Sequence, residues 1–338
     1  MMNAAVSCDG EKVATGLNIE ERGWLVSLLG QKVHFDVPMR RHTTLAVGGP
    51  ADALAMPADI KDLTTLLSGA RQRAIPWLIV GGGSNLLVRD GGVRGIVIAL
   101  TPYFKGITTI GHGRESVRVA AKAGTRLQTL CRYTIERGLA GITFAVGIPG
   151  SVGGAIAMNA GTADGWISDV LETITVLWPT GRLQRLSRAD LDFGYRRLYL
   201  PTPQITAGDH QGVIIEGTFA FPRADVQQLR INSQKIKERR RRRQPVGVSS
   251  AGCFFKNPPS GPSAGELIDK AGLKGKRVGG AEISFRHGNF IINRGNASAA
   301  DILTLADIIE ARVAVEFGVR LEPEVIIVGE SNHASKSI

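Results

Sequence analysis

One cysteine lies in a segment whose residue types could carry out chemistry. The segment Ser249–Pro258, SSAGCFFKNP, places Cys253 between a glycine and two phenylalanines. A cysteine in such a place can be a core residue, a metal ligand, a nucleophile or a group with a rarer role. The chain has three cysteines, no C-x-x-C pair and no histidines at metal-binding spacing from a cysteine, so no metal site is predicted. The residues alone leave the other roles open.

Two glycine-rich segments are candidates for binding phosphate groups. They are VGGGSN, Val80–Asn85, and GIPGSVGGAIAMNAG, Gly147–Gly161. Glycine lets main-chain N–H groups approach a ligand closely and point the same way, as a pyrophosphate requires. Neither segment fits the P-loop pattern or the Rossmann spacing. Two ordinary tight turns are the alternative, but the pair, with TTLAVGGPAD at Thr43–Asp52 upstream, favours a dinucleotide cradle.

The elements that would position these residues are a mixture of helices and strands. Apolar spacing predicts helices over residues 58–74, 126–139, 223–245, 264–273 and 297–318. Apolar runs bounded by turn residues predict strands within residues 76–88, 95–100, 116–124, 172–181, 212–221, 289–293 and 324–329. Residues 1–36 are expected to form a helical extension with a weak apolar stripe at Leu25, Leu28 and Leu29. The second of these helices places Cys131 at a core position.

Length and composition describe an ordinary globular chain. Its 338 residues suffice for two or three domains, and 43% apolar residues can fill their cores. The N-terminus lacks the basic start and long apolar run of a signal peptide, and runs such as GIVIAL are too short to span a bilayer. We therefore expect a reduced, soluble protein in the cytoplasm without a membrane partner.

The net charge of +11 raises the possibility of nucleic-acid binding. Much of the excess comes from one segment, KIKERRRRRQ, Lys235–Gln244. No aromatic residue is interleaved with these arginines, as stacking on single strands would require. A solvated helix face is favoured over RNA binding, and a basic surface near a site for phosphate-bearing ligands remains a third interpretation.

The order of several motifs resembles a known family. RHTTLAVGGPA, VGGGSNLLV and GIPGSVGGAIAMNAG look like the FAD-binding half of UDP-N-acetylenolpyruvoylglucosamine reductase, of the vanillyl-alcohol-oxidase-like flavoprotein superfamily. The resemblance continues through FGYRR (Phe193–Arg197), SSAGCFFKNP, AGELIDKAGLKG, HGNFIIN and LEPEVIIVG. It covers roughly Val37 to Gly329, and the later motifs are specific to the reductase.

The resemblance implies an α/β (α+β) fold with a two-part FAD-binding unit and a smaller α/β substrate-binding domain. The expected ranges are 37–222 for the FAD-binding domain, with subdomains of about 37–101 and 102–222, then 223–330 for the substrate-binding domain and 331–338 for a polar tail. Residues expected to bind FAD are Gly81, Gly82, Gly83, Ser84, Asn85, Gly147, Ile148, Pro149, Gly150, Ser151, Gly153, Gly154 and Ala155.

The resemblance also implies the reaction. NADPH would reduce FAD, and the flavin would reduce the enolpyruvyl ether of UDP-N-acetylglucosamine to UDP-N-acetylmuramate, an early step of peptidoglycan synthesis. Hydride arriving at C3 leaves carbanion character at C2 that is delocalised into the carboxylate, so the site must stabilise an enolate and protonate C2. The partners would be this nucleotide sugar and NADPH, with no nucleic acid.

The motif matches assign roles to individual residues. The family has serine or cysteine at the position of Cys253, which favours a proton donor to C2. Arg196 would bind the carboxylate, and Glu324 would donate a hydrogen bond to the enolate; their neighbours Arg197 and Glu322 do not match the motifs. Candidates for holding the diphosphate, sugar or carboxylate are Tyr195, Lys256, Asn257 and His287, the last of which could equally be a structural histidine.

Two further points follow from the resemblance. The stretch between Arg196 and Cys253 has no long insertion, so the chain resembles the shorter class of these reductases, without a tyrosine loop over the substrate. The nearest rival is another flavoenzyme of the superfamily, in which a residue such as His42 would tether the flavin covalently.

Overall fold

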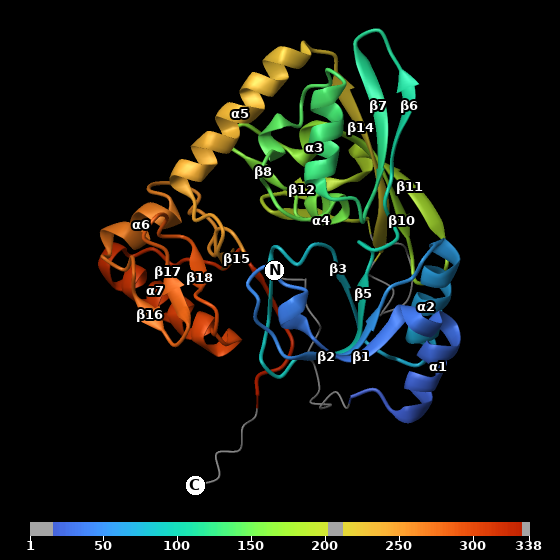
Figure 1. The fold of residues 1–338 in the computed structure, drawn as a ribbon, viewed down its shortest axis with the longest axis horizontal. Helices are drawn as coiled ribbons and strands as arrows, with labels where there is room; N and C mark the ends of the chain where they lie inside the picture. The colour runs from blue at the N-terminus through green and yellow to red at the C-terminus, as the bar shows by residue number, and fades with distance from the viewer. Residues whose placement is uncertain (1–15, 202–211, 333–338) are drawn as a thin grey trace.

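The computed structural model describes residues 16–201 and 212–332 and shows three parts (Figure 1). We name them the first lobe (residues 16–100), the second lobe (residues 101–222) and the C-terminal unit (residues 249–328). The expected N-terminal extension up to residue 15, residues 202–211 of the stretch without an insertion, and the tail from residue 333 lie outside the described residues. No helix among the described residues is long and apolar enough to cross a membrane.

The first lobe is a four-stranded sheet covered by two helices. The sheet has the order β1-β2-β5-β3, with strands β1 (Val33–Pro38), β2 (Pro50–Ala55), β5 (Val93–Ala99) and β3 (Trp77–Val80). Helix α2 (Ile60–Gln72) begins at its N-cap Asp59 and buries Leu63, Leu66 and Leu67 against the sheet. Helix α1 (Ile19–Leu29) packs beside α2 through Leu25 and Leu29. The predicted helical extension is therefore only partly helical, because residues from Val33 on form an edge strand that pairs with β2.

The second lobe is a five-stranded antiparallel sheet. Its order is β11-β10-β14-β7-β6, with strands β11 (Leu183–Ser187), β10 (Leu171–Leu177), β14 (Val213–Pro222), β7 (Ser116–Lys122) and β6 (Ile107–His112). Helices α3 (Leu127–Glu136) and α4 (Val152–Ala157) pack together, and α4 contacts β14 and β7. Cys131 on α3 is buried in the core of this lobe, as predicted. Burial raises the pKa of its thiol to about 12.

Two small hairpins extend from the second lobe. They are formed by β8 (Gly161–Thr162) with β9 (Gly165–Trp166), and by β12 (Asp192–Gly194) with β13 (Arg197–Tyr199). The basic helix α5 (Val226–Arg243) then connects this lobe to the C-terminal unit (Figure 1). Ile236 of α5 packs against the core of the second lobe.

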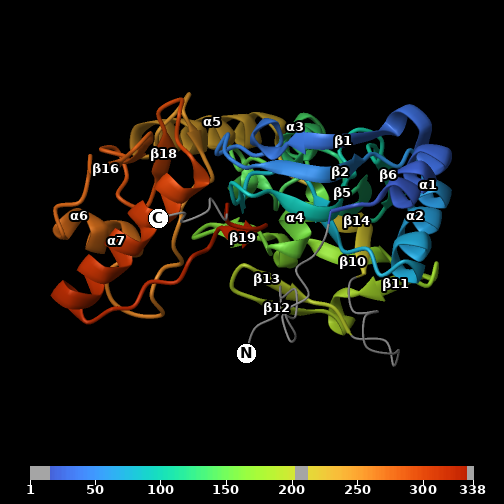
Figure 2. The same cartoon turned by 90° about the horizontal axis from the view of Figure 1, so that it is seen from below.

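The C-terminal unit shares its core with the first lobe. Its sheet has the order β15-β18-β17-β16, with strands β15 (Ser249–Ser250), β18 (Ile291–Asn293), β17 (Ala281–Ile283) and β16 (Arg277–Val278), and it carries helices α6 (Ala264–Lys270) and α7 (Ala299–Phe317). Leu45, Val47 and Leu87 of the first lobe belong to the same apolar cluster. Strand β19 (Ile326–Val328) leaves this unit and pairs in parallel with β4 (Leu86–Val88), so it lies between the parts in Figure 2.

Polar contacts also hold the C-terminal unit on the first lobe. The Asp90 carboxylate accepts hydrogen bonds of 2.9 Å from the main-chain N–H groups of Ala299 and Ala300, in the first turn of α7. The Asn293 amide donates to the Leu45 carbonyl at 3.0 Å. These contacts fix the relative position of two segments that are about two hundred residues apart in the chain.

Replacing Asp90 with alanine should lower the free energy of unfolding by about 1 kcal/mol, because helix-capping carboxylates contribute about that much. Urea denaturation followed by tryptophan fluorescence measures the change. Asp192→Ala is the matched control, since this aspartate is exposed, and its unfolding free energy should change by less than about 0.5 kcal/mol. Equal effects of the two substitutions would show that Asp90 does not hold α7.

Candidate active site

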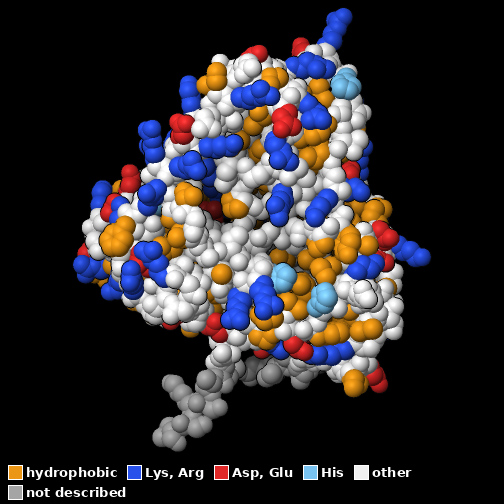
Figure 3. All heavy atoms as spheres, in the orientation of Figure 1, with side chains coloured by type: hydrophobic (Ala, Val, Ile, Leu, Met, Phe, Trp, Pro, Cys, Tyr) orange, Lys and Arg blue, Asp and Glu red, His pale blue; other side chains and the backbone are white. Residues whose placement is uncertain are grey.

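A cavity of about 580 Å³ lies between the two glycine-rich loops and the start of the C-terminal unit. The first loop follows β3 directly, and the second leads into α4. The C-terminal end of α5 and the segment that carries Cys253 form another wall. Lys and Arg side chains are frequent on the surface along α5 (Figure 3).

The loops approach each other closely because they carry glycine. Gly83 has φ +61°, and a Cβ at this position would lie 1.9 Å from the His42 carbonyl oxygen. A Cβ on Gly82 would lie 2.8 Å from the Gly150 Cα. Within the described residues, the main-chain N–H groups of Gly82, Gly83 and Ser84 donate to no protein group. They are therefore available to an anionic ligand, as a pyrophosphate cradle requires.

The structure brings together all but one of the residues expected to bind FAD. Those that line the cavity are Gly81, Gly82, Gly83, Ser84, Asn85, Gly147, Ile148, Pro149, Gly150, Ser151, Gly154 and Ala155. Gly153 does not line it, because it faces β7: its N–H donates to the Ala123 carbonyl, and a Cβ would lie 2.8 Å from the Ala123 Cβ. Asn85 has a second contact, since its amide donates to the Glu324 carbonyl at 3.0 Å. His42 is not among the lining residues.

Cys253 lines the cavity from the segment between β15 and α6. Burial raises the pKa of its thiol to about 12, and the nearby Glu324 acts in the same direction. The positive charges of Arg196 and Arg240 oppose this rise. The thiol therefore keeps its proton at neutral pH, while cations are placed to stabilise the thiolate that remains if the proton is given away.

Arg196 of the second lobe forms an ion pair with Glu324 of the C-terminal unit. The Arg196 Nε–H donates to Glu324 Oε1 at 2.7 Å, and Nη1 donates to the Gly161 carbonyl at 3.0 Å. Arg196 has φ +56°, an uncommon conformation for a residue with a side chain. Burial raises the pKa of the Glu324 carboxyl, and Arg196 opposes the rise. The main chain of Glu324 donates to the Phe254 carbonyl at 2.7 Å, which ties it to the residue after Cys253.

The candidate substrate-binding residues lie at different distances from this centre. Tyr195 is 45% exposed, and its partial burial and the nearby Glu324 carboxyl raise the pKa of its phenol. Lys256 pairs with Glu322 at 3.1 Å, and the Asn257 side chain accepts from the Ala264 N–H at 3.1 Å. Tyr195, Lys256 and Asn257 do not line the cavity, and neither do His287 and Arg197.

His287 is placed as a structural residue. Its Nδ1 accepts from the Asn289 N–H at 3.2 Å, and its ring packs on Phe290 with the ring centroids 4.8 Å apart. Burial lowers its pKa, so it is neutral at physiological pH. The sequence analysis left this interpretation open beside substrate binding, and the described contacts favour it.

Arg240, within the arginine run, is a lining residue that was not among those predicted from the sequence. Its side chain passes over Gly147 and lines the cavity, while its neighbours Arg241 to Arg243 are exposed. Burial lowers the pKa of Arg240, and the adjacent Arg239 charge adds to this effect. No ion pair of Arg240 is present in the described part of the chain. The signal that could have found it is the position of the run just before the cysteine segment.

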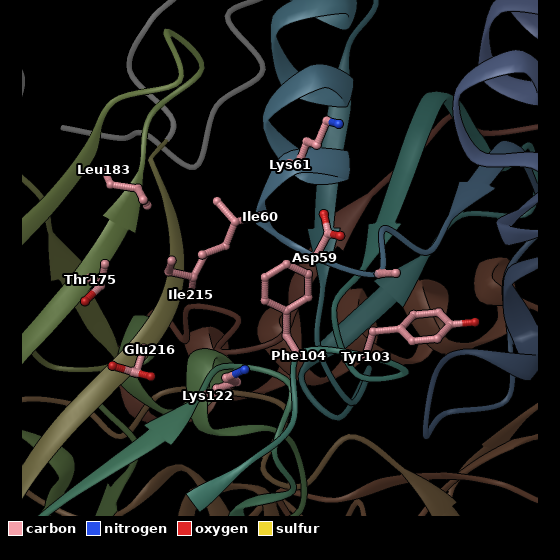
Figure 4. A pocket seen from close by; sticks show the side chains of 11 residues that line it. Asp59, Ile60, Lys61, Tyr103, Phe104, Lys122, Thr175, Leu183, Ile215 and Glu216 are labelled. Atoms are coloured by element: carbon pink, nitrogen blue, oxygen red, sulfur yellow. The ribbon is translucent and has the colours of Figure 1, made fainter. Parts of the chain in front are cut away.

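A second cavity, of about 460 Å³, lies elsewhere, between the start of α2 and the sheet of the second lobe (Figure 4). Ile60, Phe104, Lys122 and Glu216 are among its lining residues, and no predicted site residue is. Among the described residues, no group of three or more histidine, cysteine or acidic side chains could hold a metal ion. The cavity at Cys253 is therefore the candidate active site.

Comparisons with known proteins agree with this geometry. A family model described as "FAD binding domain" matches residues 51–187, and one described as "UDP-N-acetylenolpyruvoylglucosamine reductase, C-terminal domain" matches residues 244–328. The curated reductase of that name from Desulfosudis oleivorans is 48% identical, with 91% of this chain and 98% of the relative covered. The one from Pelobacter propionicus is 44% identical, with 94% and 99% covered.

A solved structure gives the same result. The crystal structure of UDP-N-acetylenolpyruvylglucosamine reductase from Thermus caldophilus superimposes with a TM-score of 0.70 at 36% identity. The match covers 87% of this chain and 97% of that one. With such relatives over most of its length, the chain belongs to the UDP-N-acetylenolpyruvoylglucosamine reductase family.

Proposed function

We propose that Cys253, Arg196 and Glu324 carry out the proton transfer and charge stabilisation of the family reaction in the cavity described above. The protein is an FAD-dependent oxidoreductase that reduces the enolpyruvyl ether of UDP-N-acetylglucosamine with NADPH, in peptidoglycan synthesis. The observation that carries the assignment of roles is the convergence of a thiol, a guanidinium and a mostly buried carboxyl from three distant segments on the cavity between the glycine loops.

The residues of the two loops fit FAD. The free N–H groups of Gly82, Gly83 and Ser84 would hold its pyrophosphate, and no side chain at Gly150 or Gly154 obstructs the approach from the opposite loop. Arg240, which lies over Gly147 of the second loop, adds a positive charge to the lining of the cavity. Bound FAD supplies the hydride for the reaction, which it takes from NADPH.

Arg196 meets the electrostatic demand of the substrate. Its guanidinium is permanently charged, and its Nη2 donates to no group among the described residues, so it can bind the enolpyruvyl carboxylate. The negative charge on that carboxylate grows as C2 gains carbanion character. Because Arg196 is mostly buried, its attraction for that charge is stronger than in water.

Glu324 supplies a hydrogen bond to the enolate, and Cys253 supplies the proton to C2. A raised pKa keeps a larger share of Glu324 protonated, and in that form it can donate a hydrogen bond to the developing enolate. The Cys253 S–H bond then breaks as a new C2–H bond forms, and the thiolate left behind regains its proton from water. A pKa near 12 does not prevent this step, because an enolate carbon is a far stronger base than a thiolate.

The surroundings of the reaction remain predictions. We place the protein in the cytoplasm, where its nucleotide sugar and NADPH would be found. The shorter-class assignment and the domain boundaries expected from the sequence also stay predictions.

Gly154→Val should reduce FAD retention, because the new side chain would enter the cavity where the cofactor's pyrophosphate would bind. A Cβ at this position meets no main-chain atom and only the Ser151 hydroxyl at 3.4 Å, so the fold should tolerate it. The ratio of flavin to protein absorbance after dialysis measures retention. Gly23→Val, on the exposed side of α1, is the control and should keep its flavin. Normal retention by the Gly154 variant would exclude the second loop as part of the cradle.

Cys253→Ala should accept hydride from NADPH normally and then stall with reduced flavin when the enolpyruvyl substrate is added. A positioned general acid contributes roughly 10²–10⁴-fold, so reoxidation in a stopped-flow experiment should slow by that factor. Cys253→Ser should retain much of the activity, since a hydroxyl can donate the same proton. Cys131→Ala, which changes a buried thiol outside the cavity, is the control. If the Cys253 alanine variant were reoxidised at the wild-type rate, Cys253 would be only a packing residue.

A further inference from the structure

The position of Arg196 is not explained by its ion pair alone. Arg196 lies in the turn of the β12–β13 hairpin, with a main-chain φ of +56°. Its side chain reaches the Gly161 carbonyl of the β8–β9 hairpin. Its partner Glu324 has a raised pKa, so this pairing weakens whenever the carboxyl takes up a proton. A guanidinium that must bind a substrate carboxylate needs a support that does not depend on that proton.

Two aromatic rings provide such a support. The Arg196 Cζ lies 5.2 Å from the centre of the Trp166 ring and 5.1 Å from the centre of the Tyr195 ring. The two rings are 5.8 Å apart and meet edge to face at 69°. A guanidinium within about 6 Å of an aromatic ring centre is attracted to it, and this attraction persists at any pH where arginine is charged. Tyr195 precedes Arg196 in the chain, whereas Trp166 belongs to the β8–β9 hairpin.

Trp166 also supports the second contact of Arg196. It pairs with Gly161 in the β8–β9 hairpin, and its ring packs so tightly on Gly161 that a Cβ there would lie 2.4 Å from the indole. The Gly161 carbonyl is the group that accepts from Arg196 Nη1 at 3.0 Å. The Trp166 main-chain N–H donates to Asp169 at 2.8 Å, which holds the end of the hairpin. Trp166 thus contacts the Arg196 guanidinium through its ring and also packs on Gly161, whose carbonyl accepts from that guanidinium.

Trp166 is outside the reacting centre. Gly161 and Arg196 line the cavity, but Trp166 does not, so it supports them from behind. We propose that Trp166 is a positioning residue that holds the Arg196 guanidinium in the orientation required to bind the substrate's carboxylate. The inference rests on the proposed function, because it takes Arg196 as the carboxylate-binding residue.

The test compares ligands with and without the carboxylate. The enolpyruvyl substrate and UDP-N-acetylglucosamine share the nucleotide and the sugar, and only the first has a carboxylate. Calorimetric titration of each into the oxidised, FAD-loaded enzyme, without NADPH, measures binding with no turnover. For Trp166→Leu we expect about tenfold weaker binding of the enolpyruvyl substrate and unchanged binding of UDP-N-acetylglucosamine. Trp166→Phe, which keeps an aromatic ring, should stay within about threefold of wild type for both.

The rates provide a second readout. In stopped-flow experiments, reduction of the flavin by NADPH should be unchanged in Trp166→Leu, and its reoxidation by substrate should slow by roughly ten- to a hundredfold, as small misplacements of a reacting geometry do. The matched control is Tyr199→Leu, which removes a similar contact, 4.2 Å from the Arg197 Cζ, on the same hairpin as Arg196. It should behave as wild type in both experiments.

Three outcomes would overturn the inference. Wild-type substrate binding and reoxidation in Trp166→Leu would show that the ring does not hold Arg196. Equal weakening of both ligands, or loss of FAD, would show a general structural role. If wild-type enzyme itself failed to be reoxidised by the enolpyruvyl substrate, the proposed function would fall, and the inference with it.

Discussion

The pairing of β19 with β4 is the contact on which the rest of the site depends. It places Glu324, near the end of the chain, beside the first glycine loop, where the Asn85 amide donates to its carbonyl and the Ile326 N–H donates to the Asn85 carbonyl, each at 3.0 Å. The N–H of Glu324 binds Phe254 on the other side. One short strand therefore brings the first glycine loop, Glu324 and the cysteine segment together, and Arg196 pairs with Glu324 in this arrangement.

Burial and nearby positive charges have opposite effects on the pKa values of Cys253 and Glu324. Removal from water raises the pKa values of both Cys253 and Glu324, which favours the protonated forms that a proton donor needs. Arg196 opposes the rise of both pKa values and Arg240 opposes that of Cys253, but neither cancels it. A reaction that generates negative charge on the substrate therefore finds protons and fixed positive charge already in place, with little rearrangement required.

The helices, the strands and the candidate site could be predicted from the sequence more readily than the directions in which single side chains point. The period of Leu63, Leu66 and Leu67 identified α2, and the two-part FAD-binding fold with a smaller C-terminal unit is confirmed. Gly153 and Gly154 could not be told apart from the sequence, because both lie in the first turn of α4 and only the packing of Gly153 on Ala123 shows which of them faces the cavity.

The remaining differences have the same origin. Residues 33–36 were expected within a helical extension, although they begin strand β1, because their pairing with β2 is not visible in their own composition. Arg240 was grouped with a run for which a solvated helix face was favoured, yet its side chain lines the cavity while Arg241, Arg242 and Arg243 are exposed. Trp166 carries no motif, and its contact with Arg196 depends on two hairpins that only the folded chain brings together. Tertiary contacts of this kind leave no local pattern.

The late position of β19 also has a consequence for the order of assembly during synthesis. Strand β4 pairs with no other strand in the described part of the chain, and its partner is made about 240 residues later. The two lobes that contain the glycine loops can begin to fold as they leave the ribosome, but β4, which follows the first loop, gains its partner only after residues 326–328 have been made. A chain that stopped before β19 would therefore contain both glycine loops but would lack the strand that pairs with β4 beside the first loop.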